Sequence, residues 1–145
     1  MIRNESEYRE AVQRVTQEKD RLDEHRKHLK EAGLTADQVS KALEPVRAFH
    51  LQLVEEVAAY ERLRRGEFEE IHNFQGFGQL LVALRVSLGI TQRELAKRLG
   101  VDETQISRDE RNEYHNIGVD RAEKILQALG VTVKTVVERV EGRAA

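Results

Sequence analysis

The chain has 145 residues, of which 34% are charged and 5% are aromatic, with one proline and no cysteine. This composition is typical of a helix-rich protein with a thin core, and the lack of cysteine excludes disulfides and thiolate metal sites. The net charge of −2 supplies no general attraction for nucleic acid, so any DNA contact must depend on the local placement of a few cations.

No apolar run approaches the roughly twenty residues that a membrane-spanning helix needs, so we expect no membrane partner. The first ten residues, MIRNESEYRE, lack the apolar core of a signal peptide. Together with the absence of cysteine, this indicates a cytoplasmic protein. His25 and His28 are three residues apart, but no further close ligand accompanies them, and we expect neither a metal nor another cofactor.

Residues 1–66 are predicted to form an antiparallel hairpin of two long helices. Asn4 can cap the first helix and Gly33 can end it, while Thr35 opens the second helix with a capping box. The apolar residues of the second helix recur at steps of three and four, which is the spacing of a coiled-coil seam. They keep their phase across Pro45, which favours one continuous, kinked helix over two separate ones.

This hairpin buries only one face of each helix, and so small a core is marginal by itself. We therefore expect the hairpin to dock on the rest of the chain, on a second copy that completes a four-helix bundle, or on another protein. Its predicted role is dimerisation or partner binding.

The second half of the chain is predicted to be a separate domain. Residues 67–76 form a connector with two or three apolar anchors, and residues 77–130 follow as the domain itself. Its first helix, residues 77–88, and a later helix, residues 119–129, both have apolar residues at helical spacing.

Between these helices, residues 91–111 predict two short helices joined by a tight turn. Thr91 and Glu94 can form a capping box for the first of them. Gly100 can adopt the left-handed conformation that ends it, and Asp102 can cap the next helix. This is the layout of a helix-turn-helix, in which the second helix enters the DNA major groove.

The segment LGITQRELAKRLGVDETQISRDER resembles the helix-turn-helix of the phage-repressor (XRE) family, and the resemblance covers roughly residues 77–130. It implies a lambda-repressor-like domain. Asp109 stands where the family usually has an apolar residue, and Asn112 stands where it often has glycine. The positions that match the family are Thr91, Gln92, Glu94, Leu95, Ala96, Gly100, Ile106 and Glu110.

The resemblance implies that Glu103, Thr104 and Arg108 read base edges. Arg108 can donate two hydrogen bonds to guanine, Thr104 can place its methyl on thymine, and Glu103 can accept from cytosine. The alternative is an ordinary solvated helix face. Expected phosphate contacts, which position the protein without reading sequence, are Gln92, Arg93, Ser107, Arg111 and His115.

The resemblance also implies a buried ion pair between Arg85, on the first helix of the domain, and Glu110, on the recognition helix. An arginine in an otherwise leucine-rich helix needs a carboxylate if it is to be buried.

The final segment, residues 131–145, begins with VTVKTVVERV. Its valines and threonines favour a strand, although the valine spacing also fits a helix. We expect a short strand, and the nearest partner for it is the same segment of a second copy across a two-fold axis.

Taken together, the sequence predicts an all-α protein with an N-terminal hairpin and a DNA-binding domain. The leading functional prediction is a homodimeric transcriptional repressor bound to double-stranded DNA. The alternative is an antitoxin similar to the HigA-like group, which represses its own operon and neutralises a toxin through residues 1–66. A structural adaptor whose helix-turn-helix is not used on DNA is a third reading. We find no nucleophile with a base, phosphate loop or carboxylate pair, and expect no enzymatic activity.

Overall fold

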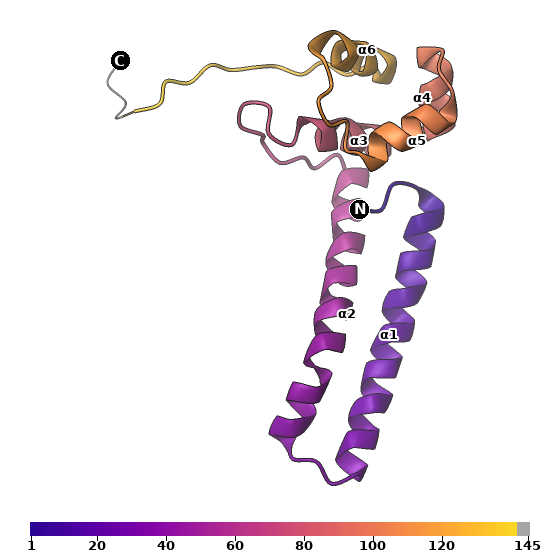
Figure 1. Ribbon diagram of the computed structural model, residues 1–145, viewed down its shortest axis with the longest axis vertical. Coiled ribbons are helices and arrows are strands. Elements are labelled where there is room, and N and C mark those ends of the chain that lie inside the picture. The colour runs from indigo at the N-terminus through magenta and orange to yellow at the C-terminus, as the bar shows by residue number, and fades with distance from the viewer. Residues whose placement is uncertain (142–145) are drawn as a thin grey trace.

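The computed structural model describes residues 1–141, which form six helices and no strand. A long hairpin of α1 and α2 stands against a compact group of four shorter helices (Figure 1). Within residues 1–141, no helix combines the length and the apolar character needed to traverse a lipid bilayer. The helices are α1 (Glu5–Glu31), α2 (Ala36–Arg64), α3 (Phe77–Ser87), α4 (Gln92–Leu99), α5 (Glu103–Arg111) and α6 (Val119–Leu129).

Both helices of the hairpin begin at side-chain caps. The Asn4 side chain accepts a hydrogen bond from the Glu7 N–H at 2.8 Å at the start of α1. Thr35 and Gln38 form both hydrogen bonds of a capping box at the start of α2. Helix α2 runs without interruption past Pro45. These caps satisfy backbone donors that the first turn of a helix leaves free.

Two separate apolar clusters hold the hairpin together. The cluster near the α1–α2 turn contains buried Leu22, Val39 and Leu43. The cluster at the opposite end contains Leu53 and Tyr60, and it continues without a break into the core of the helix-turn-helix domain. The open end of the hairpin therefore shares a core with the rest of the chain, whereas the turn end does not.

The N-terminal residues and the end of α2 make the junction with the domain. Ile2 is 5% exposed and belongs to the shared core. The rings of Tyr8 and Tyr60 stack with their centroids 4.9 Å apart, and the Tyr8 hydroxyl donates to Glu61 at 2.7 Å. Of the three docking arrangements predicted for the hairpin, the single chain uses the one on its own DNA-binding domain.

The connector is less anchored than its sequence suggested. Ile71 is half-buried, but Phe68 and Phe74 are 41% and 74% exposed. The predicted strand after α6 is wrong for the single chain: residues 131–140 form neither a strand nor a helix and extend away from the domain (Figure 1). A strand needs a hydrogen-bonded neighbour, and the described residues supply none. Residues 142–145 of the predicted C-terminal segment lie outside the described residues.

Candidate nucleic-acid interface

Helix α4 begins at a side-chain cap and ends at a glycine. The Thr91 hydroxyl accepts a hydrogen bond from the Glu94 N–H at 3.0 Å. Gly100 has a φ of 68°, the left-handed conformation that favours glycine at the end of a helix. The predicted capping box is only half formed, because the Glu94 carboxylate pairs with Arg98 at 3.3 Å one turn further on.

Asp102 is the N-cap residue directly before α5, but its side chain makes no capping hydrogen bond. The Gln105 N–H, which the carboxylate was expected to bind, donates at 3.0 Å to the backbone carbonyl of Asp102. The predicted side-chain cap is therefore wrong, although the helix begins where expected. Ile106 is fully buried and, with half-buried Val101, anchors the inner face of α5 in the core.

An ion pair between Arg85 of α3 and Glu110 of α5 lies in the centre of the domain. The two residues are 2% and 0% exposed, and the guanidinium contacts the carboxylate through both Nε and Nη2. Nη1 also donates to the Ile90 carbonyl at 2.8 Å, and Nη2 to the Arg3 carbonyl at 3.1 Å. The pair joins α3, α5, the turn between α3 and α4, and the N-terminal segment.

Helix α6 contacts both helices of the helix-turn-helix, α4 and α5. Asp109, which departs from the family pattern, forms an ion pair with Arg121 of α6. Arg98 of α4 donates to the Ala128 carbonyl of α6 at 2.9 Å. A polar residue at position 109 is thus accommodated because α6 supplies a cation opposite it.

The outer face of α5 carries the residues expected to read bases. Glu103, Thr104 and Arg108 are all exposed. No hydrogen bond or ion pair within residues 1–141 uses the Arg108 side chain, whereas exposed Arg111 donates to half-buried Ser107 at 3.4 Å. The arrangement leaves Arg108 able to make both of its guanidinium hydrogen bonds to a ligand.

The other residues expected to contact phosphate lie at two places. Arg93 is exposed on the first turn of α4, and His115 is exposed in the turn between α5 and α6. The half-buried side-chain amide of Gln92 donates one hydrogen bond to Glu110 at 2.8 Å. The second N–H of this amide and the backbone N–H of Gln92, in the first turn of α4, remain available to an anion.

A comparison with known protein families identifies the domain that contains α4 and α5. A family model described as helix-turn-helix matches residues 81–136, which span α3 to α6 and the start of the C-terminal segment. This segment is a helix-turn-helix domain of the XRE type. Comparisons with curated proteins and with solved structures found no match. The chain thus carries the DNA-binding domain of an XRE-type transcription regulator.

The sequence predicts a loop between α5 and α6 in this XRE domain, but neither its backbone conformation nor its packing was foreseen. Glu113, Tyr114 and Asn116 all have a positive φ, between 50° and 59°. Gly78 of α3 packs directly against this turn: a Cβ at this position would lie 1.9 Å from the Glu113 carbonyl oxygen. The signal in the sequence was a glycine inside a helix, which usually marks a close approach of backbones.

Tyr114 is the buried centre of that turn. It is 4% exposed, and its hydroxyl has no hydrogen-bond partner among the described residues. Burial, followed by the nearby carboxylates of Glu110 and Asp109, raises the pKa of the Tyr114 hydroxyl well above its ordinary value. Because a neutral phenol is an apolar ring with one polar atom, Tyr114 acts here as a core residue.

Proposed function

We propose that this protein is a dimeric, sequence-specific repressor that inserts α5 into the major groove of an inverted-repeat operator in the cytoplasm. The observation that carries the proposal is the division of α5 into two faces. Ile106 and Glu110 hold its inner face rigidly in the core, while Glu103, Thr104 and Arg108 are exposed on the outside. A rigid helix with a free arginine on its outer face is the geometry that base recognition needs.

In this proposal each base-reading residue has a chemical role. Arg108 donates two hydrogen bonds to the N7 and O6 atoms of guanine. Thr104 places its methyl against a thymine methyl, and Glu103 accepts a hydrogen bond from the amino group of cytosine. Three different side chains on one helix face would then specify neighbouring base pairs.

Phosphate contacts would set the position of α5 in the groove. We assign them to the side chains of Arg93, Ser107, Arg111 and His115, and to the backbone N–H of Gln92. A phosphate contact at the Gln92 N–H is supported by its position, because the free N–H groups and the dipole of a helix N-terminus favour an anion. The side-chain amide of Gln92 also donates a hydrogen bond to Glu110.

The net charge of −2 makes electrostatics a weak source of affinity for this chain. Few phosphates can be neutralised by one copy, so non-specific binding by a single copy should be weak, and each phosphate contact that does form should add to its salt dependence. Two copies on two half-sites double the number of contacts, which supports a dimer as the active form.

Selection of bound duplexes from a random pool tests the proposal. We expect an inverted repeat with half-sites about 10 bp apart, or a multiple of that spacing. A pool that yields no enriched sequence, from protein shown to be folded, would contradict sequence-specific binding.

Two matched arginine variants then separate base reading from phosphate binding. Arg108→Ala should weaken operator binding by about 1–3 kcal/mol and leave binding to scrambled DNA almost unchanged. Arg93→Ala should weaken both alike and reduce the salt dependence by about one charge. Both are measured on operator and scrambled duplexes across a salt series. An equal loss for Arg108→Ala on both duplexes would make Arg108 a phosphate contact.

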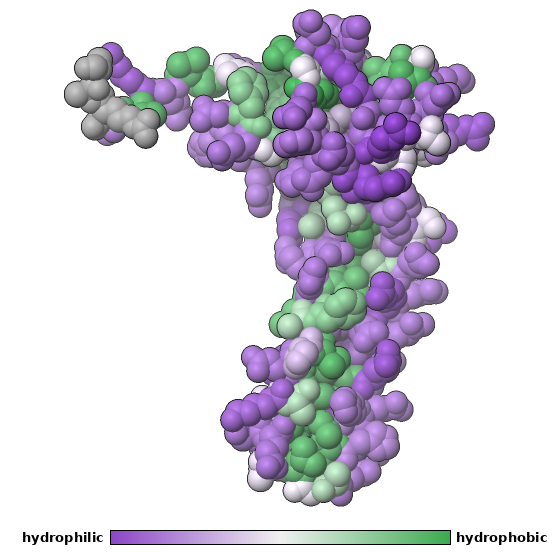
Figure 2. Space-filling model, in the orientation of Figure 1, coloured by the Kyte–Doolittle hydropathy of each residue, from purple (hydrophilic) through white to green (hydrophobic). Residues whose placement is uncertain are grey.

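A second candidate function is an antitoxin that neutralises a toxin through the hairpin. The observation that favours it is apolar surface on the hairpin, where Phe49 and Leu51 are 47% and 60% exposed. Figure 2 shows an apolar stripe that follows the hairpin away from the DNA-binding domain. The test is whether a small toxin gene adjoins this one, and whether co-expression of this protein relieves toxicity. Loss of that relief in Phe49→Ser, with DNA binding intact, would support this function.

A further inference from the structure

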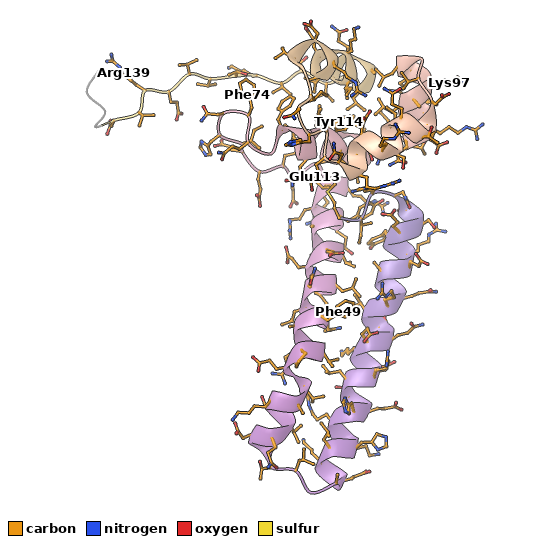
Figure 3. The ribbon with its side chains drawn as sticks, in the orientation of Figure 1. Phe49, Phe74, Lys97, Glu113, Tyr114 and Arg139 are labelled. Carbon is orange, nitrogen blue, oxygen red and sulfur yellow. The ribbon has the colours of Figure 1, made fainter. Side chains whose placement is uncertain are left out.

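The C-terminal segment, residues 131–140, borders a hollow that the single chain leaves open. This hollow has a volume of about 740 Å³. Its walls are the connector at Phe74, the turn between α5 and α6, helix α6 at Val119, and the C-terminal segment itself at Val133 and Thr135. Figure 3 shows Phe74 on the connector and Arg139 toward the outer end of the segment.

Several apolar side chains around this hollow are uncovered. Phe74 is 74% exposed and Val119 is 78% exposed on its walls, while Val136 and Val137 of the C-terminal segment are 66% and 92% exposed. Adjacent apolar groups of this kind mark an interaction site more often than scattered ones do. The Val131 N–H donates to the Leu126 carbonyl at 3.0 Å, but among the described residues the backbone donors and acceptors of residues 132–140 have no backbone partner.

The sequence of the segment is complementary to itself. If residues 132–140 of two copies pair antiparallel along their whole length, the two-fold axis passes through Val136. In this register Lys134 of each copy lies opposite Glu138 of the other, so the ribbon contains two attractive cross-strand pairs. Shifting the register by one residue would place Lys134 opposite Val137 or Arg139, and both pairs would be lost.

The same register gives the two faces of the ribbon different chemistry. Successive side chains of a strand point to opposite faces, so Val133, Thr135 and Val137 share one face while Lys134 and Glu138 share the other. Val133 and Thr135 already line the hollow. The face with the charged pairs is then directed to solvent.

The hollow can also accommodate the side chains that the strand of the second copy would place in it. The partner strand would place its residue 137 beside Thr135 and its residue 139 beside Val133, on the face toward the hollow. Residue 137 is an exposed valine and residue 139 an arginine. In the walls of the hollow, Phe74 and Val119 would pack against this valine. The exposed carboxylates of Glu113 and Glu123 would pair with the arginine.

We propose that the C-terminal segments of two copies form an antiparallel β-ribbon centred on Val136, and that each segment closes the hollow of the other copy. This inference rests on the dimer in the proposed function and specifies where its two chains meet. It also accounts for the lack of a strand in the single chain: the hydrogen-bonded neighbour belongs to the second copy.

Disulfide trapping of the full chain tests the register directly, because the natural sequence contains no cysteine. Residues that face each other across a two-fold axis of an antiparallel pair have Cα atoms about 4.5–5.5 Å apart, which a disulfide can bridge. Val136→Cys should therefore form a disulfide with its own copy under mild oxidation. Thr132→Cys should not, since its two copies would lie about 26 Å apart at 3.3 Å per residue.

A mixture of two cysteine variants provides the matched control. Thr132→Cys and Val140→Cys protein, each without a disulfide alone, should form a mixed disulfide when combined, because these positions face each other in the ribbon. Efficient self-linking of Thr132→Cys would overturn the register. Failure of Val136→Cys to link, in protein that light scattering shows to be dimeric, would overturn the ribbon and leave the proposed dimer intact. A monomer at micromolar concentration and moderate salt would overturn both.

Charge reversal supplies a second, independent measurement on the same contact. Lys134→Glu or Glu138→Lys alone should raise the dimer dissociation constant about tenfold, since two attractive pairs become repulsive. An equimolar mixture of the two variants should dimerise as well as the unmodified chain, because both pairs in the mixed dimer are attractive again. Lys124→Glu, at an exposed position of α6, is the control and should have little effect. Absence of recovery in the mixture would contradict the pairing of residues 134 and 138.

Discussion

Replacing Arg85 with methionine should destabilise the protein more than any surface change. The guanidinium of Arg85 makes two contacts with the Glu110 carboxylate and donates to two backbone carbonyls. Without it, the 0% exposed Glu110 keeps only the side-chain amide of Gln92 as a donor. Stranding one partner of a buried ion pair costs about 3–5 kcal/mol, which for a chain of this size corresponds to a fall in Tm of about 10–20 °C.

Urea unfolding, followed by circular dichroism, measures this loss. Removal of both charges in Arg85→Met/Glu110→Leu should recover at least about 1 kcal/mol relative to Arg85→Met, because no buried charge is then left unpaired. Lys41→Met breaks an exposed pair with Asp37 and is the control, with an expected loss below about 0.5 kcal/mol. A loss for Arg85→Met as small as that of the control would refute the reasoning.

Three further changes test the turn between α5 and α6. Gly78→Ala should lower stability by about 1–3 kcal/mol, since its Cβ would meet the Glu113 carbonyl, and a calorimetric Tm at or above that of the natural sequence would contradict this. Because the raised pKa of Tyr114 means that the folded state holds its proton more tightly, stability should fall above about pH 10. Tyr114→Phe should reduce that alkaline loss in urea titrations, and an unchanged pH profile would refute the assignment. Arg121→Met should cost about 1 kcal/mol at low salt and less at high salt, and no salt dependence would argue against its pair with Asp109.

Local signals in the sequence were sufficient to locate each of the helices found in residues 1–141. Caps at Asn4, Thr35 and Thr91 act within three residues, and Gly100 ends α4 through its own backbone conformation. Apolar spacing likewise predicted α2 across Pro45. The helix-turn-helix was recognisable for the same reason, because its two helices and turn are specified by residues close together in the chain.

Sequence patterns could not show which of several possible hydrogen-bond or ion-pair partners a polar group would bind. Asp102 and Glu94 are good capping residues, but the Gln105 N–H binds a backbone carbonyl instead, and the Glu94 carboxylate binds Arg98. The pairing of Asp109 with a cation on α6 depends on how two helices cross, which no local pattern encodes.

The tertiary structure alone decided how the two halves are joined and where apolar surface stays open. Apolar seams show that the hairpin must dock, but several surfaces could satisfy them; the burial of Ile2 and Tyr60 in the core of the domain selects one. The C-terminal valines favour a strand by composition, yet a strand forms only beside another strand. Whether residues 131–140 are ordered as a strand therefore depends on a neighbour in space, whereas a helix such as α4 contains all of its hydrogen-bond partners within its own sequence.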